Sequence, residues 1–205
     1  MPTSTSPRTL LKTPLNNGRR GDAAARGRGE TTQLSPCPGV PVSRCRVLGV
    51  DPGLATTGWG IVEKNGAHLT LHRFGAILPP ARSPLPQRLC RIRQELQRVI
   101  EDFQPAVLAI EELYFAKFAV SIAATAQARG AILLTAAEAG LEVVEYNPRA
   151  VKMAMTGFGS ASKEQMQTMV QRFFHLAELP RPDDAADAMA IALCHLQTHR
   201  QLVPS

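Results

Sequence analysis

The chain has 205 residues, a length that suits one globular domain, or one domain with an appendage, and excludes most large multidomain enzymes. Of these residues 44% are hydrophobic and 20% are charged, which is close to the average of globular domains and allows a core to form. No run of about 18 uncharged apolar residues is present, which excludes a membrane-spanning helix. The formal net charge is +6, but residues 1–44 hold seven basic and two acidic residues, so the charge of the whole chain is not evidence for a nucleic-acid partner.

Residues 1–43 are rich in Ser, Thr, Pro, Gly and Arg and have no sustained apolar period. Such a segment cannot bury itself, so we predict a disordered basic tail. The same composition is typical of an organellar transit peptide, and a gene start assigned too far upstream would also produce it. We expect the folded domain to cover residues 44–200, with a short tail at 201–205, and we expect a cytoplasmic protein.

The first half of the domain is predicted to be a β-meander followed by a helix. An apolar run at 46–51 and stretches rich in β-branched and aromatic residues at 57–64 and 68–78 predict three strands. Their short connections favour antiparallel pairing. Apolar residues at helical spacing over 85–103 predict one amphipathic helix.

In the second half, strands alternate with helices. The pattern predicts strands at 106–110 and 142–146 and helices at 120–139, 149–155, 162–176 and 183–197. This order implies an α/β fold with a five-stranded mixed sheet, an antiparallel meander followed by parallel strands, flanked by helices.

The predicted helix at 120–139 is apolar on more than one side, so it needs a second surface to cover it. A two-fold contact in a homodimer and a position between other elements of the same subunit satisfy this need equally well.

Four acidic residues stand at the ends of predicted elements. Asp51 ends the first strand, Glu111 follows the strand at 106–110, and Asp184 and Asp187 lie three apart on one face of the last helix. Turn formation and helix capping explain each of them singly. Small residues around Asp184 and Asp187 would let the helix approach the sheet closely, so we expect the four carboxylates to meet in one pocket.

Carboxylates gathered in one pocket repel one another unless cations are present. Oxygen ligands without a cysteine or histidine cluster favour Mg²⁺ or Mn²⁺ over zinc. A pair of such ions is a known device for in-line phosphoryl displacement. Hydrolysis of a phosphodiester is therefore the leading hypothesis.

Five segments carry a family resemblance: VLGVDPGLATTGWGIVE (47–63), AIEELYFAK (109–117), QARGAIL (127–133), VKMAMTGFGSASKEQM (151–166) and DDAADAMAIALCH (183–195). Together they resemble the RuvC family of Holliday-junction resolvases, in collinear order over residues 46–199. The resemblance implies a ribonuclease H-like fold, a homodimer, and Mg²⁺-dependent symmetric nicking of four-way junction DNA in recombination and repair. It also implies cooperation with a RuvA/RuvB branch-migration complex.

Matched motif to motif, the resemblance places a tetrad that binds two Mg²⁺ ions, with Mn²⁺ as a substitute, on Asp51, Glu111, Asp184 and Asp187. We expect 5′-phosphate and 3′-hydroxyl products. In part of the family a histidine stands at the position of Asp184, so direct metal binding and orientation of water both stay open for this residue.

The resemblance also places DNA contacts. Lys152 and Lys163 fall near the scissile phosphate and are assigned to catalysis and DNA binding. Lys163 is the stronger candidate, because the dipole at a helix start does not favour a cation unless an anion is held there. Tyr114 and Phe115 follow Glu111 closely and are assigned to stacking on unpaired bases, and Lys117 to DNA contact.

Gly53, Thr56 and Gly58 are assigned to a tight turn beside Asp51, and the i, i+4 pair His195 and His199 to the surface. Two other functions stay open. GVDPGLATTGWG also resembles the phosphate loop of actin-like and sugar-kinase ATPases, which would make the chain a single-lobe nucleotide-binding protein. The second alternative is a non-catalytic protein that binds junctions and has kept the fold.

Overall fold

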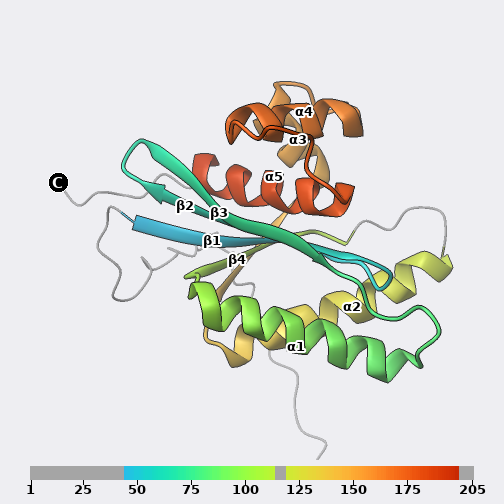
Figure 1. Ribbon diagram of the computed structural model, residues 1–205. Helices are drawn as coiled ribbons and strands as arrows, with labels where there is room; N and C mark the ends of the chain where they lie inside the picture. The colour runs from blue at the N-terminus through green and yellow to red at the C-terminus, as the bar shows by residue number, and fades with distance from the viewer. Residues whose placement is uncertain (1–43, 114–118, 199–205) are drawn as a thin grey trace, which may run out of the picture. The chain divides into compact units, whose positions relative to one another are not determined.

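The computed structural model describes residues 44–113 and 119–198 of the chain. Five strands form one mixed sheet in the order β3-β2-β1-β4-β5 (Figure 1). The pairs β1–β2 and β2–β3 are antiparallel, and the pairs β1–β4 and β4–β5 are parallel. The predicted meander and the parallel strands after it are confirmed. The strands span Arg44–Asp51 (β1), Thr57–Asn65 (β2), His68–Ile77 (β3), Val107–Glu111 (β4) and Glu142–Tyr146 (β5).

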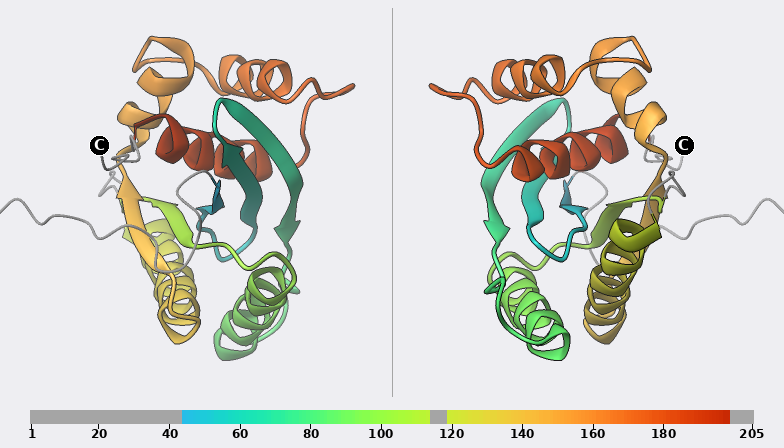
Figure 2. Two further views of the ribbon diagram at one scale, coloured as in Figure 1. Left: turned by 90° about the vertical axis from the view of Figure 1, so that its left-hand side faces the viewer. Right: turned by 90° about the vertical axis from the view of Figure 1, so that its right-hand side faces the viewer.

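Helices cover both faces of this sheet. One face carries α1 and α2, and the other carries α5, with α3 and α4 packed outside it (Figures 1 and 2). The helices span Leu85–Phe103 (α1), Ala119–Glu138 (α2), Pro148–Thr156 (α3), Lys163–Phe173 (α4) and Asp183–Thr198 (α5). None of the helices in the described ranges is long and apolar enough to cross a membrane.

Each face of the sheet has its own hydrophobic core, because successive side chains of a strand point to opposite faces. In β1, Leu48 and Val50 belong to the core under α1 and α2. Val47 belongs to the core under α5. The alternation therefore directs the odd-numbered residues of β1, including Asp51, toward α5.

Glycines in the central strands let α5 lie very close to the sheet. A Cβ atom at Gly49 would lie 2.0 Å from the main-chain oxygen of Ala188, and one at Gly58 would lie 1.9 Å from that of Asp184. On the helix side the small residues Ala185 and Ala188 are fully buried. The close approach expected from the alanines of this helix is confirmed, and it also requires glycine on the sheet side.

Three sequence expectations need correction. The helix α4 ends at Phe173 rather than at 176, because His175 takes a left-handed backbone conformation with φ of 51°. Gly58 lies inside β2, paired with Asp51, and not in the turn. His195 is buried, and its Nδ1 atom is hydrogen-bonded to the hydroxyl of Tyr146 at 2.9 Å. The expectations for residues 1–43, for His199 and for 201–205 lie outside the described residues.

Candidate active site

Asp51 and Glu111 end two neighbouring parallel strands. The register pairs Val50 with Ile110, and each acid follows its member of that pair by one residue. Ala109 and Val47 belong to the core on the α5 side, so alternation directs both carboxyls to that side. The two acids therefore share one edge and one face of the sheet.

The first turn of α5 brings the second pair of acids to the same place. Gly58 of β2 pairs with Asp51, and the main chain of Asp184 lies directly over Gly58. Asp187 lies three residues farther along, on the same side of the helix. Asp184 and Asp187 are both half-buried, whereas Asp183 is exposed. The structure thus brings together all four acids selected from the sequence.

The electrostatics of these acids identify them as one coupled group. Burial, and then the charges of Glu111, Asp187 and Asp184, raise the pKa of Asp51 from 3.8 to about 8. Burial, followed by the charge of Asp187, also raises the pKa of Glu111. Hydrogen bonding with the Asp51 side chain acts in the opposite direction and lowers this pKa. Burial is again the main reason why the pKa of Asp187 is raised. Such a group stores repulsion that a cation would relieve.

The acids are coupled through charge, but they do not form a ready-made metal cage. Within residues 44–113 and 119–198, no three or more carboxylate, histidine or cysteine side chains are arranged so that they could hold a metal ion. Coordination by this group would require its side chains to turn toward a common centre.

Two lysines border the acids. Lys163 is the first residue of α4, behind a capping box made by Ser162 and Gln165. Its Nζ atom lies 3.6 Å from Oδ2 of Asp187 and 3.6 Å from Oδ2 of Asp183. Burial opposes the charge on Lys163, but the carboxylates raise its pKa overall.

Lys152 approaches the acids from α3, and its charge acts to lower the pKa of Glu111. Both predicted lysines therefore lie within the field of the acid group. The predicted DNA contacts Tyr114, Phe115 and Lys117 lie outside the described residues.

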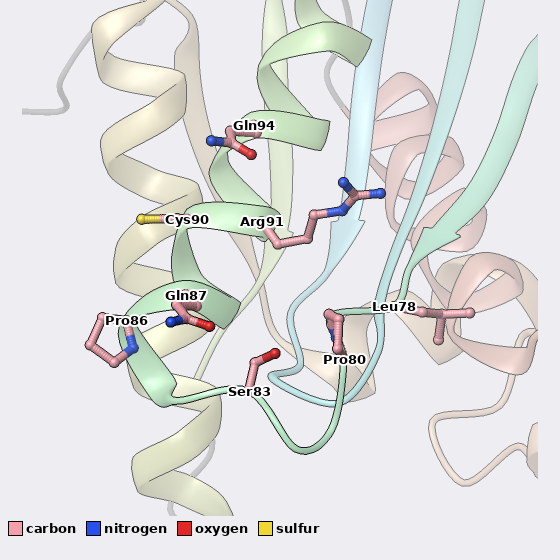
Figure 3. Close-up of a pocket in the computed structure, with 8 residues that line it drawn as sticks. All are labelled: Leu78, Pro80, Ser83, Pro86, Gln87, Cys90, Arg91 and Gln94. Carbon is pink, nitrogen blue, oxygen red and sulfur yellow. The ribbon is translucent and has the colours of Figure 1, made fainter.

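A separate hollow lies beside the connection between β3 and α1 (Figure 3). It is lined by Leu78, Pro80, Ser83, Pro86, Gln87, Cys90, Arg91 and Gln94. These residues include no carboxylate that could activate water or bind a metal ion. The acid group at the strand ends remains the better candidate for an active site.

The region that contains the acid group matches a known family. Residues 47–195 match the model of the crossover junction endodeoxyribonuclease RuvC. The chain belongs to the RuvC family. The match includes Asp51 and extends past Asp187, so the whole acid group lies within the RuvC domain.

Curated RuvC proteins support the assignment along the same stretch. The chain is 52% identical over 153 residues to the crossover junction endodeoxyribonuclease RuvC of Chloroflexus aurantiacus, which covers 75% of this chain and 93% of that protein. It is 45% identical over 155 residues to the RuvC of Syntrophomonas wolfei, covering 76% and 90%.

Solved structures agree with the fold. The structure of T. thermophilus RuvC in complex with Holliday junction substrate is 37% identical and superposes with a TM-score of 0.70, covering 74% of this chain and 93% of that one. The yeast mitochondrial Holliday junction resolvase Ydc2 is 15% identical with a TM-score of 0.55, covering 73% and 77%, and supports the fold alone. The expected ribonuclease H-like fold is thus confirmed.

The sequence analysis did not predict the role of Gly49 and Gly58, which let α5 approach the sheet beside the acid group. Their signal was present: Gly49 and Gly58 lie inside two predicted strands, and an alanine-rich helix is predicted later in the chain. Glycine inside a strand often marks a close approach of another backbone.

Proposed function

We propose that this protein is a structure-selective endonuclease that resolves four-way DNA junctions by paired, symmetric nicks in recombination and repair. The observation that carries the proposal is the meeting of Asp51 and Glu111, from two strand ends, with Asp184 and Asp187, from the start of α5. The printed name of the RuvC relatives and the junction-bound T. thermophilus structure support this choice of substrate.

The donor set fits a hard divalent cation. All four side chains offer oxygen atoms, and the raised pKa of Asp51 reflects burial and repulsion among acids. We assign two Mg²⁺ ions per subunit, with Mn²⁺ able to substitute, to Asp51, Glu111, Asp184 and Asp187. When bound, such ions lower the pKa of a water nucleophile and neutralise charge on the phosphate and the leaving oxygen.

The lysines act on the phosphate in this proposal. Lys163 has a half-exposed side chain and is held between Asp183 and Asp187. A phosphate that enters the site can replace these carboxylates as the partner of the Lys163 ammonium group. Lys152, from α3, can contact the same phosphate. Tyr114, Phe115 and Lys117 remain assigned to junction DNA, and cleavage leaves 5′-phosphate and 3′-hydroxyl ends.

A homodimer would supply two active sites for two strands. The outer side of α2 presents a stripe at helical spacing, made of Ala123, Gln127, Gly130, Leu134 and Ala137, all of them exposed. Leu134 is the large apolar member of this stripe and is 56% exposed. This stripe, here called the α2 stripe, fits a two-fold contact with a second copy. Cooperation with a RuvA/RuvB complex belongs to the same proposal.

Cleavage of a synthetic four-way junction, compared with a linear duplex of the same sequence, tests the proposal. With Mg²⁺ the wild-type protein should nick the junction and leave the duplex intact, and EDTA should stop the reaction. Asp51→Asn should lower the cleavage rate by on the order of 10³-fold, with junction affinity changed by no more than about twofold. The exposed Asp102 of α1 provides the control Asp102→Asn, which should cleave normally.

The alternatives predict other outcomes. A non-catalytic junction-binding protein would bind the junction but leave it intact with every metal, and a nucleotide-binding protein would bind ATP without cleaving DNA. Equal cutting of junction and duplex would refute structure selectivity.

A further inference from the structure

A buried arginine contacts the end of the strand that carries Glu111, from the face of the sheet opposite to the acid group. Arg129 lies in α2 and is 7% exposed. Its Nη1 atom donates a hydrogen bond to the main-chain oxygen of Glu111 at 2.5 Å. Its Nη2 atom lies 2.6 Å from Oε1 of Glu145.

These two contacts make one rigid connection among three elements. Glu145 lies in β5 and pairs with Ile110, the residue before Glu111. A guanidinium group is planar and holds its donors in fixed relative positions, so it sets the place of both acceptors at once. Arg129 thus joins α2, the last peptide of β4 and the neighbouring strand β5.

The contact of Arg129 with the main chain of Glu111 matters for the site because this main chain sets the position of the Glu111 carboxyl. Glu111 is the last residue of β4, and the Glu112 amide after it donates a hydrogen bond to the main-chain oxygen of Tyr146 in β5, at 2.8 Å. The carboxyl of Glu111 is directed to the α5 side, the same side as the carboxyl of Asp51 on the neighbouring strand. A shift of this strand end would therefore move the carboxyl relative to Asp51.

Because Arg129 is buried, its guanidinium group depends on its two partners. A charged group withdrawn from water is stable only when its partners are in place, and loss of one partner leaves it uncompensated. Glu145 is half-exposed, with 49% of its side chain accessible, so it can reorient into solvent. The main-chain oxygen of Glu111 has no such freedom.

We propose that Arg129 is a positioning residue for Glu111, which holds the end of β4 so that the Glu111 carboxyl faces Asp51. This inference rests on the proposed function. It assigns a role to the arginine of the segment QARGAIL, which acts through the main chain of Glu111 and does not touch the substrate.

The test compares Arg129→Met, Arg129→Lys and Glu145→Gln with the wild-type protein. The matched control is Arg93→Met, which removes the exposed ion pair of Arg93 with Glu138, 2.8 Å long, between α1 and α2. Three quantities are measured: the single-turnover rate of junction cleavage, junction affinity in EDTA, and the rise in Tm that Mg²⁺ causes in the absence of DNA.

Arg129→Met should lower the cleavage rate by on the order of 10²-fold, because a small displacement of a catalytic group is enough for such a loss. Junction affinity should change by no more than about twofold, and the rise in Tm with Mg²⁺ should shrink. Arg129→Lys should give an intermediate rate, since one ammonium group cannot reproduce the fork. Glu145→Gln keeps the contact with Glu111 and still offers an amide oxygen to Nη2 of Arg129, so this variant should cleave at nearly the wild-type rate. Arg93→Met should do the same.

A wild-type rate in folded Arg129→Met would overturn the positioning role, and so would a Glu145→Gln variant that loses as much activity as Arg129→Met. If Arg129→Met does not fold, a wild-type rate in folded Arg129→Lys overturns it. The proposed function fails separately: in that case the wild-type protein itself leaves the junction intact. Failure of the positioning role alone appears as active wild type, inactive Glu111→Gln and active Arg129→Met.

Discussion

Asp51 is held in an environment that opposes its ionisation. It ends a buried strand and faces Glu111, Asp184 and Asp187, and these neighbours, after burial itself, raise its pKa to about 8. Lys163 is the cation that acts against this rise. An acid in such surroundings destabilises the folded protein when it ionises, unless a cation is bound.

The stability of the metal-free protein should therefore depend on pH. Between 3.8, the ordinary pKa of Asp, and about 8, the folded state keeps a proton on Asp51 that the unfolded chain has released. The free energy of unfolding in EDTA should fall as the pH rises through this window, and this effect of Asp51 should level off above it. The raised pKa values of Glu111 and Asp187 act in the same direction.

Urea unfolding of wild type and Asp51→Asn at about pH 5 and about pH 8 measures this effect. Asparagine cannot ionise. In EDTA the free energy of unfolding of the variant should therefore exceed that of the wild type by on the order of 1–3 kcal/mol at the higher pH, and by less at the lower pH. Asp102→Asn serves as the control and should match the wild type. A wild-type stability that rises across this window would contradict the coupling of the acids.

The helix α5 places its two acids by contact with glycines of the sheet. The main chain of Asp184 occupies the volume that a side chain at position 58 would fill. Gly60 differs, because a Cβ there would meet the Cγ atom of Met189 at 2.7 Å rather than a main-chain atom. A flexible side chain can move aside, whereas a helix backbone moves as a unit.

Gly58→Ala and Gly60→Ala should therefore differ in both stability and activity. We expect Gly58→Ala to lower the free energy of unfolding by about 3 kcal/mol, the upper part of the usual range for overpacking, and Gly60→Ala to lower it by about 1 kcal/mol. Gly58→Ala should also reduce junction cleavage far more than junction binding, because the start of α5 is displaced. Chemical denaturation and single-turnover cleavage measure the two effects, and equal losses in the two variants would refute this account.

Local patterns in the sequence predicted the elements well and selected four acids that the fold brings together, for identifiable reasons. Hydrophobic periodicity marked the strands and helices, and Asp51 and Glu111 were recognisable because a charge follows an apolar run. The roles of Gly58 and Arg129 depend on which element lies across from them, which no local pattern contains. The early end of α4 was missed because His175, not a glycine, takes the left-handed conformation there.

The proposed catalytic group and the proposed dimer contact lie on opposite faces of the sheet. The face under α5 holds the acid group and both lysines, and the opposite face carries α1 and α2. The α2 stripe points away from the sheet, whereas Ala128, Ile132 and Ala136 of the same helix are buried in the core. Arg129, also in α2, links this helix to the end of β4. A contact with a second copy through the α2 stripe would thus be mechanically connected to Glu111.

Leu134→Glu tests whether the α2 stripe forms the dimer. The side chain is exposed in the single chain, so the variant should fold normally, whereas two glutamates buried at a two-fold contact would repel each other and lose hydration. Light scattering should give the mass of a monomer, and junction cleavage should change from paired nicks to single, uncoupled nicks. Leu78→Glu, at another exposed leucine, 66% accessible and outside the stripe, should remain dimeric and cut both strands. A Leu134→Glu protein that stays dimeric and still makes paired nicks would show that the subunits meet through a different surface.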